Sequence, residues 1–244
     1  MLSEWDLLYS SLHTAEEFYT MEKFKQLLKR YWLAIPAIIY ACIYLPWFGH
    51  LEDTITKHYR VIHHPLDDII PFCEIFIIPY LLWFGYVAVV VVLLFFVDQK
   101  SYIKCCVFMA VGMTLFLIIS TIFPNGHHLR PQVMPRDNIF TDMIAKLYLT
   151  DTSTNIFPSI HVYNSIAAHL GIAKCEALRK YRGLRFGSLI LSVSIILSTV
   201  LIKQHSVLDL FGAIILSFLV YLPIYGIHKH PHVKTSHRRK HKAA

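Results

Sequence analysis

The feature that most constrains the fold is a set of six apolar stretches, each nearly free of charged residues. They cover residues 32–48, 69–97, 102–123, 158–173, 186–202 and 207–227. Each approaches the ~20 residues that a helix needs to cross the hydrocarbon of a bilayer. Hydrophobic residues make up 55% of the chain, more than one water-soluble core can bury, and they lie in blocks without strand or helix periodicity. The sequence therefore predicts an all-α membrane protein with a bundle of six transmembrane helices.

Lysine and arginine are distributed unevenly between the two sets of helix ends. Seventeen of the 23 lie in the segments 23–30, 100–104, 174–185 and 229–242. The other six lie in the segments 49–68, 124–157 and 203–206. Because cytoplasmic segments of membrane proteins are enriched in basic residues, we expect both termini in the cytoplasm. The second set of segments is then predicted to share the outer face, and the plasma membrane is the expected location.

The two ends of the chain differ from its apolar middle. Trp5, Leu8 and Leu12 fit on one helical face, so we expect residues 1–30 to form an amphipathic helix on the cytoplasmic side of the membrane. Residues 228–244 form a basic, histidine-rich segment, which predicts a cytoplasmic tail near anionic lipid head groups. The predicted organisation is therefore this helix, a six-span catalytic domain over 31–227, and the tail.

Polar residues gather in three places on the predicted outer side. The segment 124–157 is unusually long for a connection without strong periodicity, and such connections are often functional. It contains "GHHLRP" and also "FTDMIAKLYL", which predicts a short amphipathic helix. The motif "FPSIH" opens the fourth span, and "STVLIKQHSVLD" joins the fifth span to the sixth. The residues of interest are His127, His128, Arg130, Ser159, His161, Ser198, Thr199, Lys203, His205 and Asp209.

The spacing of His205 and Asp209 indicates a nucleophilic histidine. If the sixth span begins near His205, residues four apart lie on one face of the helix. Asp209 then accepts a hydrogen bond from one imidazole nitrogen and leaves the lone pair of the other free to attack. A carboxylate inside a membrane span is costly without such a partner.

The other two clusters supply groups suited to a phosphate. Pro158 and Ser159 are typical of a helix start, whose free N–H groups attract anions, and His161 follows within one turn as a proton donor. The guanidinium of Arg130 matches the geometry of phosphate oxygens. Together these residues predict phosphoryl transfer without a metal or other cofactor. No P-loop and no carboxylate cluster for a metal pair occurs in the sequence.

These motifs resemble those of the type 2 phosphatidic acid phosphatase (PAP2) superfamily. That family carries Lys-x6-Arg-Pro, Pro-Ser-Gly-His and Ser-Arg-x5-His-x3-Asp in this order. Arg130-Pro131 match the end of the first motif, and "PSIH" matches the second with Ile160 in place of glycine. Ser198, His205 and Asp209 match the spacing of the third. The resemblance implies a six-helix bundle, a phosphohistidine formed on His205, and Asp209 as the residue that orients it. It also implies His161 as the proton donor, and Arg130 and Ser159 as holders of the phosphoryl oxygens.

Two cations of the family pattern are missing from this chain. Phe123 stands at the lysine position of the first motif, and Thr199 stands at the arginine position of the third. We expect Lys203 to replace one of them, with His127, His128 and Arg136 as further candidates. A phosphodiester carries one negative charge and a phosphomonoester nearly two, so a site with fewer cations favours a diester.

The expected function is an integral-membrane lipid phosphatase that hydrolyses a phospholipid or a polyprenyl phosphate. The alternative is a lipid phosphotransferase that moves a phosphorylated head group to a lipid alcohol, since the motifs are also similar to those of inositol phosphorylceramide and sphingomyelin synthases. A transporter or scaffold would predict matching half-repeats interrupted by glycine or proline, which the sequence lacks. The expected partners are a lipid substrate and the bilayer, with no nucleic acid.

Overall fold

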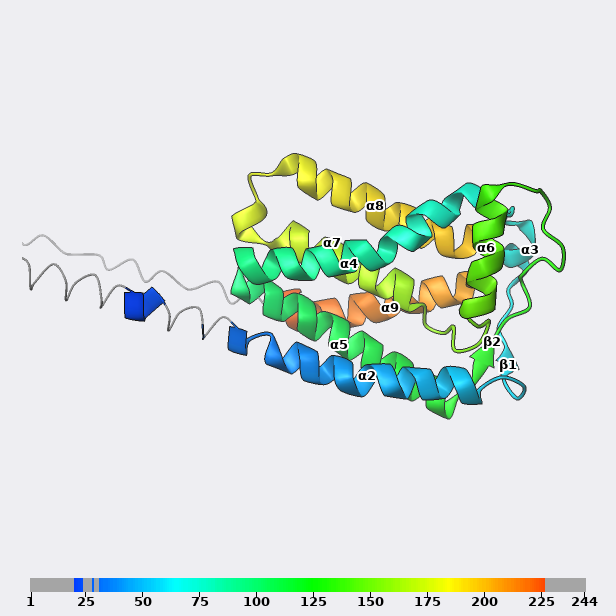
Figure 1. Ribbon diagram of the computed structural model, residues 1–244, viewed down its shortest axis with the longest axis horizontal. Helices are drawn as coiled ribbons and strands as arrows, with labels where there is room; N and C mark the ends of the chain where they lie inside the picture. The colour runs from blue at the N-terminus through cyan, green and yellow to red at the C-terminus, as the bar shows by residue number, and fades with distance from the viewer. Residues whose placement is uncertain (1–19, 24–27, 29–30, 227–244) are drawn as a thin grey trace, which may run out of the picture.

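The computed structural model describes residues 20–23, 28 and 31–226 (Figure 1). The helix predicted over 1–30 therefore lies mostly, and the tail at 228–244 entirely, outside the described residues. The elements follow in the order α2 (Ile35–Thr54), β1 (Arg60–Val61), α3 (Pro65–Ile69), η1 (Glu74–Phe76), α4 (Ile77–Val97), α5 (Gln99–Ile122), β2 (Asn125–Gly126), α6 (Ile139–Thr150), α7 (Ile160–Lys174), η2 (Glu176–Leu178), α8 (Arg182–Leu201), α9 (Val207–Tyr221) and the π-helical turn η3 (Leu222–Gly226).

Four helices are long and apolar enough to cross a membrane. They cover Glu74–Val97, Gln99–Ile122, Arg182–Leu201 and Val207–Gly226. Their outward faces carry many exposed large side chains, for example Val89, Val193 and Phe218, which are 65%, 44% and 62% exposed. An apolar surface of this extent is unfavourable in water and matches the acyl chains of a bilayer. The sequence prediction of an all-α integral membrane protein is confirmed at this level.

The first and fourth predicted spans also form helices, α2 and α7. α2 has 20 residues, but its last turns carry His50, Glu52 and Asp53. α7 has only 15 residues, which is about 22 Å at 1.5 Å per residue. The stretch predicted as one span over 69–97 is divided into the end of α3, the short turn η1 and α4. Six membrane crossings therefore remain a prediction.

α7 occupies the middle of the bundle, in contact with α4, α5, α8 and α9 (Figure 1). Its contact with α5 is close because Gly112 has no side chain: a Cβ there would lie 2.0 Å from the ring of Tyr163. The Tyr163 hydroxyl donates to the carbonyl of Phe108, and the two rings stack with centroids 5.0 Å apart. These contacts fix the position of α7, and with it the position of His161 in its first turn.

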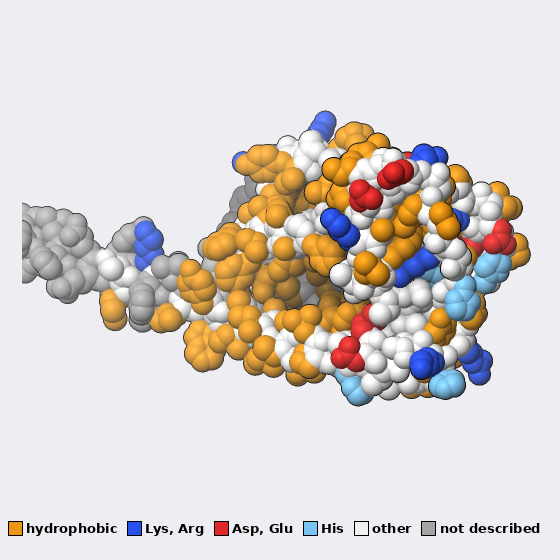
Figure 2. All heavy atoms as spheres, turned by 45° about the vertical axis from the view of Figure 1, so that its right-hand side comes forward, with side chains coloured by type: hydrophobic (Ala, Val, Ile, Leu, Met, Phe, Trp, Pro, Cys, Tyr) orange, Lys and Arg blue, Asp and Glu red, His pale blue; other side chains and the backbone are white. Residues whose placement is uncertain are grey.

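The polar connections gather at one end of the bundle. β1 pairs in parallel with β2, so Arg60 lies beside Asn125. The helix predicted from "FTDMIAKLYL" is present as α6 and lies across this end, in contact with η1 and α4 (Figure 1). Figure 2 shows histidine and charged side chains at this end, and hydrophobic side chains along the flank. The three segments that were predicted to share one face are therefore neighbours.

Candidate active site

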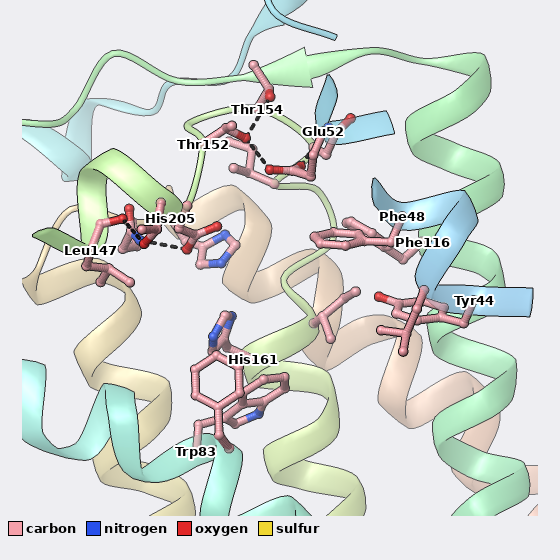
Figure 3. Close-up of a pocket in the computed structure, with 18 residues that line it drawn as sticks. Tyr44, Phe48, Glu52, Trp83, Phe116, Leu147, Thr152, Thr154, His161 and His205 are labelled. Carbon is pink, nitrogen blue, oxygen red and sulfur yellow. Dashed lines mark hydrogen bonds between the residues drawn. The ribbon is translucent and has the colours of Figure 1, made fainter. Parts of the chain in front are cut away.

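A cavity of about 390 Å³ opens at this polar end, and we call it the histidine cavity. Side chains from α2, α4, α5, α6, α7 and the α8–α9 turn line it. His161 and His205 point toward each other across the cavity, and their ring centroids are 5.8 Å apart (Figure 3). Tyr44, Phe48 and Phe116 form the facing wall. The two predicted catalytic histidines therefore meet at one space, although 44 residues separate them in the sequence.

His205 lies in the turn that precedes α9, not on the helix itself. The backbone N–H groups of Gln204 and His205 both donate to the carbonyl of Thr199, which folds the chain back sharply. Ser206 is the N-cap of α9, and Asp209 closes the capping box by accepting from the Ser206 N–H at 2.8 Å. His205 Nδ1 is 3.4 Å from Asp209 Oδ2. The two residues of the predicted pair are therefore brought together across a capped helix start, within ion-pair distance but without a hydrogen bond between them.

Asp67 anchors this turn from a distant part of the sequence. Its side chain is 3% exposed and accepts hydrogen bonds from the Ser206 hydroxyl at 2.6 Å and the Val207 N–H at 2.8 Å. It also accepts from the N–H of His64 and so caps α3. One buried carboxylate thus ties the start of α3 to the start of α9. Asp67 fixes the backbone on the C-terminal side of His205.

His161 is held in the first turn of α7 by aromatic rings. Ser159 is the N-cap of this helix, as predicted, and its hydroxyl accepts from the Val162 N–H. The imidazole stacks on Tyr80 with a centroid distance of 4.5 Å and lies 4.2 Å from the Trp83 ring. His161 Nε2 and Trp83 Nε1 are both buried without a hydrogen-bond partner, and both residues line the cavity. Two buried nitrogen atoms of the cavity, on His161 and Trp83, therefore have no partner among the described residues.

The charged residues that line the histidine cavity are acidic. Glu52 of α2 accepts hydrogen bonds from the Thr152 hydroxyl and from the Asn155 amide at 2.8 Å (Figure 3). Asp151 accepts from the Tyr80 hydroxyl at 3.0 Å and the Gln204 amide at 2.8 Å. Burial raises the pKa of Asp151 above its ordinary value. No lysine or arginine is among the described residues that line this cavity.

Arg130 does not line the cavity as the resemblance implied, but lies behind its wall. Its guanidinium donates to the carbonyls of Tyr148 and Thr152 at 3.2 and 2.7 Å, and to Gln204 Oε1 at 2.5 Å. It also stacks over the Tyr148 ring at 4.4 Å. Burial lowers the pKa of this guanidinium. Its contacts support Gln204, the neighbour of His205. The residues that line the cavity therefore separate the charge of Arg130 from the cavity itself.

Three further candidates for the missing cations also lie outside the lining of the cavity. Lys203 Nζ donates to the carbonyls of Asp67 and Ile70, each at 2.6 Å, and lines a separate hollow beside α3. The His128 ring lies tilted against the Tyr59 ring, with centroids 5.9 Å apart, and lines that same hollow. Arg136 forms an ion pair with Glu74 on the surface. Lys203, which was expected to replace a missing cation, therefore does not line the histidine cavity, because its ammonium group is bound to carbonyls at α3.

His127 is buried next to the turn that carries His205 and is neutral. Its Nδ1 accepts from the Leu129 N–H at 3.0 Å, and its Nε2 donates to the carbonyl of Gln204 at 2.8 Å. This pattern fixes one neutral tautomer. Burial, and then the nearby His205, lower the pKa of His127 to about 3. His127 therefore supports the turn and supplies no positive charge.

The hydroxyls of Ser159, Ser198 and Thr199 form hydrogen bonds with backbone groups of their own helices. The hydroxyls of Ser198 and Thr199 donate to the carbonyls of Ile195 and Ile196, so neither group faces the cavity. Ser159 is completely buried as a helix cap. These residues shape the turns that carry His161 and His205. The structure gives them no contact with the space where a phosphate would lie.

Several residues of this site had no recognisable signal in the sequence. Glu52, Trp83 and Asp151 line the cavity, and Asp67 sits beneath it. An acidic residue next to an apolar run, such as Glu52 or Asp67, was the only available signal, because charge near a membrane span calls for a partner. The partners of Glu52 and Asp67 lie 100 and 140 residues away in the chain, so the pairing could not be read from local sequence.

The comparisons with known proteins add no further assignment. Within the described ranges, no group of three or more histidine, cysteine, aspartate or glutamate residues is placed to hold a metal ion. No protein-family model, no curated protein and no solved structure matches the chain.

Proposed function

We propose that this protein is an integral-membrane enzyme that transfers a phosphoryl group from a lipid through a phosphohistidine on His205. The observation that carries the proposal is the geometry of three side chains from two helix starts. His205 lies 3.4 Å from the carboxylate that orients it, and 5.8 Å, centroid to centroid, from a second histidine with an unpartnered nitrogen. The proposal places the phosphorus atom of the lipid next to both rings and to the apolar wall of the cavity.

The reaction follows from the roles of the two rings. His205 Nε2 attacks phosphorus and forms a P–N bond, while the P–O bond to the leaving oxygen breaks. Protonated His161 gives its Nε2 proton to that oxygen. A water molecule then loses a proton to His161, attacks phosphorus and breaks the P–N bond, which restores both histidines. The nucleophile is a side chain, so the proposed cycle needs no metal.

Hydrolysis by water makes the enzyme a lipid phosphatase, which is the first candidate. Transfer to a lipid hydroxyl is the second, and the charge of the histidine cavity favours it. A phosphomonoester brings nearly two negative charges next to Glu52 and Asp151, where no described lysine or arginine lines the wall. A phosphodiester brings one. An enzyme that holds a phosphorylated head group on His205 needs less positive charge than an enzyme that releases free phosphate.

The proposed arrangement in the membrane follows the distribution of basic residues. α2, α4, α5, α7, α8 and α9 are the six proposed crossings, with both termini in the cytoplasm. The short α7 would cross where neighbouring helices cover both of its ends. The histidine cavity would then open on the outer side of the plasma membrane, where its lipid substrate enters from the leaflet.

The direct test uses the purified full-length protein in detergent with a panel of phosphomonoester and phosphodiester lipids. Wild-type protein is expected to release phosphate or to form a new phospholipid, and His205→Gln is expected to lower that rate at least about 1,000-fold. The matched control is His128→Gln, a histidine at the same end of the bundle that does not line the cavity. Equal rates for His205→Gln and the control would refute the assigned nucleophile.

The same assay separates the two candidates when a lipid alcohol is added. Hydrolysis predicts free phosphate or a free phosphorylated head group whose amount does not depend on the alcohol. Transfer predicts a labelled lipid product that appears only with the alcohol. Acid-labile label on wild-type protein, absent from His205→Gln, would identify the phosphohistidine in either case.

A further inference from the structure

A second cavity, of about 380 Å³, lies at the opposite end of the bundle. It is formed where α4 meets α5, where α7 leads through η2 to α8, and where η3 ends α9. Five basic side chains line it, and we call it the basic cavity: Lys100, Lys104, Lys174, Arg179 and Arg185. None of these residues belongs to the site proposed for catalysis.

The acidic residues that line the basic cavity neutralise little of this charge. Asp98 caps α5 and accepts from both the N–H and the hydroxyl of Ser101. Glu176 lies 3.7 Å from Arg179, and this is the one ion pair among the described residues of the cavity. The three lysines form no ion pair within the described ranges, so a net positive charge faces the cavity.

Aromatic rings position two of these lysines. Lys104 Nζ lies 5.4 Å from the centroid of the Tyr225 ring, and Lys174 Nζ lies 5.4 Å from that of Tyr221. The two rings stack on each other with centroids 5.6 Å apart. Arg185 donates to the carbonyl of Ala173 at 2.9 Å, which closes the end of α7 and leaves its other donors free. Lys104 and Lys174 therefore place their ammonium groups within cation–π distance of these rings.

Tyr225 gives an independent indication of a ligand. Its side chain is 6% exposed, it lines the basic cavity, and its hydroxyl has no hydrogen-bond partner among the residues that the structure describes. A buried hydroxyl without a partner is costly, and the cost is removed when a ligand accepts its hydrogen bond. A negatively charged group that accepts hydrogen bonds would suit both this hydroxyl and the lysines that line the cavity.

Exposed apolar side chains on the elements that form the cavity indicate that such an acceptor belongs to a lipid. Phe96, Tyr181 and Phe186, on the elements that form the cavity, are 54%, 50% and 64% exposed. A lipid whose head group enters the cavity can lay its acyl chains on these apolar side chains. Basic pockets between helices at a membrane surface bind anionic head groups in this way.

We propose that the basic cavity binds the phosphate-bearing head group of an anionic phospholipid, in the leaflet opposite to the histidine cavity. Lysine ammonium groups neutralise the phosphate, and the Tyr225 hydroxyl donates to one of its oxygens. The bound lipid joins the α4–α5 corner to the α7–α8 corner and so stabilises the bundle. Free phosphate shares this chemistry, and the experiment below distinguishes the two sources.

The test measures thermal unfolding of the full-length protein in detergent, with added short-chain phosphatidylglycerol, short-chain phosphatidylcholine or inorganic phosphate. Phosphatidylglycerol is expected to raise the melting temperature of the wild type, and phosphatidylcholine is not. The triple variant Lys100→Gln/Lys104→Gln/Lys174→Gln is expected to bind phosphatidylglycerol at least about tenfold more weakly. Tyr225→Phe is expected to weaken binding by about three- to tenfold. Its melting temperature without lipid should stay unchanged, since the hydroxyl has no partner to lose.

The matched control is Lys180→Gln/Arg182→Gln, which removes two cations from the same end of the bundle but outside the cavity. It should keep wild-type lipid binding. A control as weak as the triple variant, or Tyr225→Phe binding as well as wild type, would overturn the site in favour of general surface charge. Equal stabilisation by inorganic phosphate would assign the site to free phosphate. His205→Gln should bind the lipid normally, so failure here and failure of the proposed enzymatic activity are separate results.

Discussion

The two ends of the bundle carry cavities of nearly equal volume and opposite chemistry. The histidine cavity is about 390 Å³ and is lined by two histidines, two carboxylates and aromatic rings. The basic cavity is about 380 Å³ and is lined by five basic side chains. The cavity proposed for phosphoryl chemistry is thus the one without a lining cation among the described residues. Binding a phosphate and reacting with it place different demands on a site: binding needs positive charge, and the reaction needs an oriented nucleophile and a proton donor.

The cations at the polar end of the bundle explain this difference. Arg130, Lys203 and Arg136 are present near the histidine cavity, but carbonyl groups and Glu74 use their donors. Arg130 and Lys203 stabilise the turn that carries His205, whereas Arg136 binds Glu74 of η1. At the other end the lysines have no such partners within the described ranges, so their charge faces the cavity. The same residue types therefore serve structure at one end and are free to bind a ligand at the other.

The largest expected effect tests whether His161, in the histidine cavity, is the proton donor of the proposed reaction. His161→Gln is expected to lower kcat by about 100- to 10,000-fold, because the leaving oxygen loses its general acid. The loss should be smaller for substrates with an acidic leaving group, which need less protonation. His169→Gln on the same helix is the control, since that ring contacts Ser188 away from the cavity. A loss that does not depend on the leaving group would place His161 outside the proton transfer.

The second prediction tests whether His127 brings a hidden positive charge to the histidine cavity. Its folded pKa of about 3 lies below the ordinary 6.5, so the unfolded chain binds a proton first as the pH falls. The contribution of His127 to stability is complete above pH 6.5 and declines between pH 6.5 and about pH 3. We expect about 2 kcal/mol less stability at pH 5 than at pH 7 from this residue.

The measurement for His127 is the difference between two unfolding curves. His127→Gln should lower the midpoint at pH 7, while its midpoint should fall less than that of the wild type between pH 7 and pH 5. A wild type that is stabilised on acidification relative to the variant would show that the ring is charged. A cation would then lie beside the turn that carries His205, although His127 does not line the histidine cavity.

The third prediction concerns Asp67, which anchors the turn that carries His205. Asp67→Asn keeps one acceptor for Ser206 or Val207 but loses the charge, so the turn that positions His205 should loosen. We expect kcat to fall about tenfold with little change in KM, because a small displacement of the nucleophile affects the reaction more than binding. Asp68→Asn is the matched neighbour, exposed and paired with His63. A change in KM alone would give Asp67 a binding role instead.

The smallest expected effect tests whether the negative charge of the histidine cavity disfavours a phosphomonoester relative to a phosphodiester. Glu52→Gln removes one negative charge from the histidine cavity and keeps one acceptor oxygen, for Thr152 or Asn155. We expect kcat/KM for a phosphomonoester to rise about threefold relative to a phosphodiester, since the dianion gains more from the change. Asp53→Asn, next to it on α2 but outside the cavity, should leave this ratio unchanged. A ratio that moves toward the diester would contradict an electrostatic role for Glu52.

The bundle could be predicted because membrane spans are determined locally. An apolar run of about 20 residues satisfies its own backbone hydrogen bonds as a helix and needs no knowledge of its neighbours. The start of α7 at Ile160 and the short helix α6 followed from capping residues and amphipathic spacing. The pairing of His205 with Asp209 also followed from spacing, although His205 proved to lie in the turn before α9.

The sequence by itself determined which segments can enter a membrane and which histidine lies next to a carboxylate, since both depend on residues within a few turns of each other. Only the tertiary structure decided which charges reach a cavity. Lys203 and Arg130 are directed away by carbonyls of Asp67 and Thr152, while Glu52 is brought in from α2. A long cationic side chain binds whichever acceptors the fold places near it, and those acceptors lie 136 and 22 residues away in the chain.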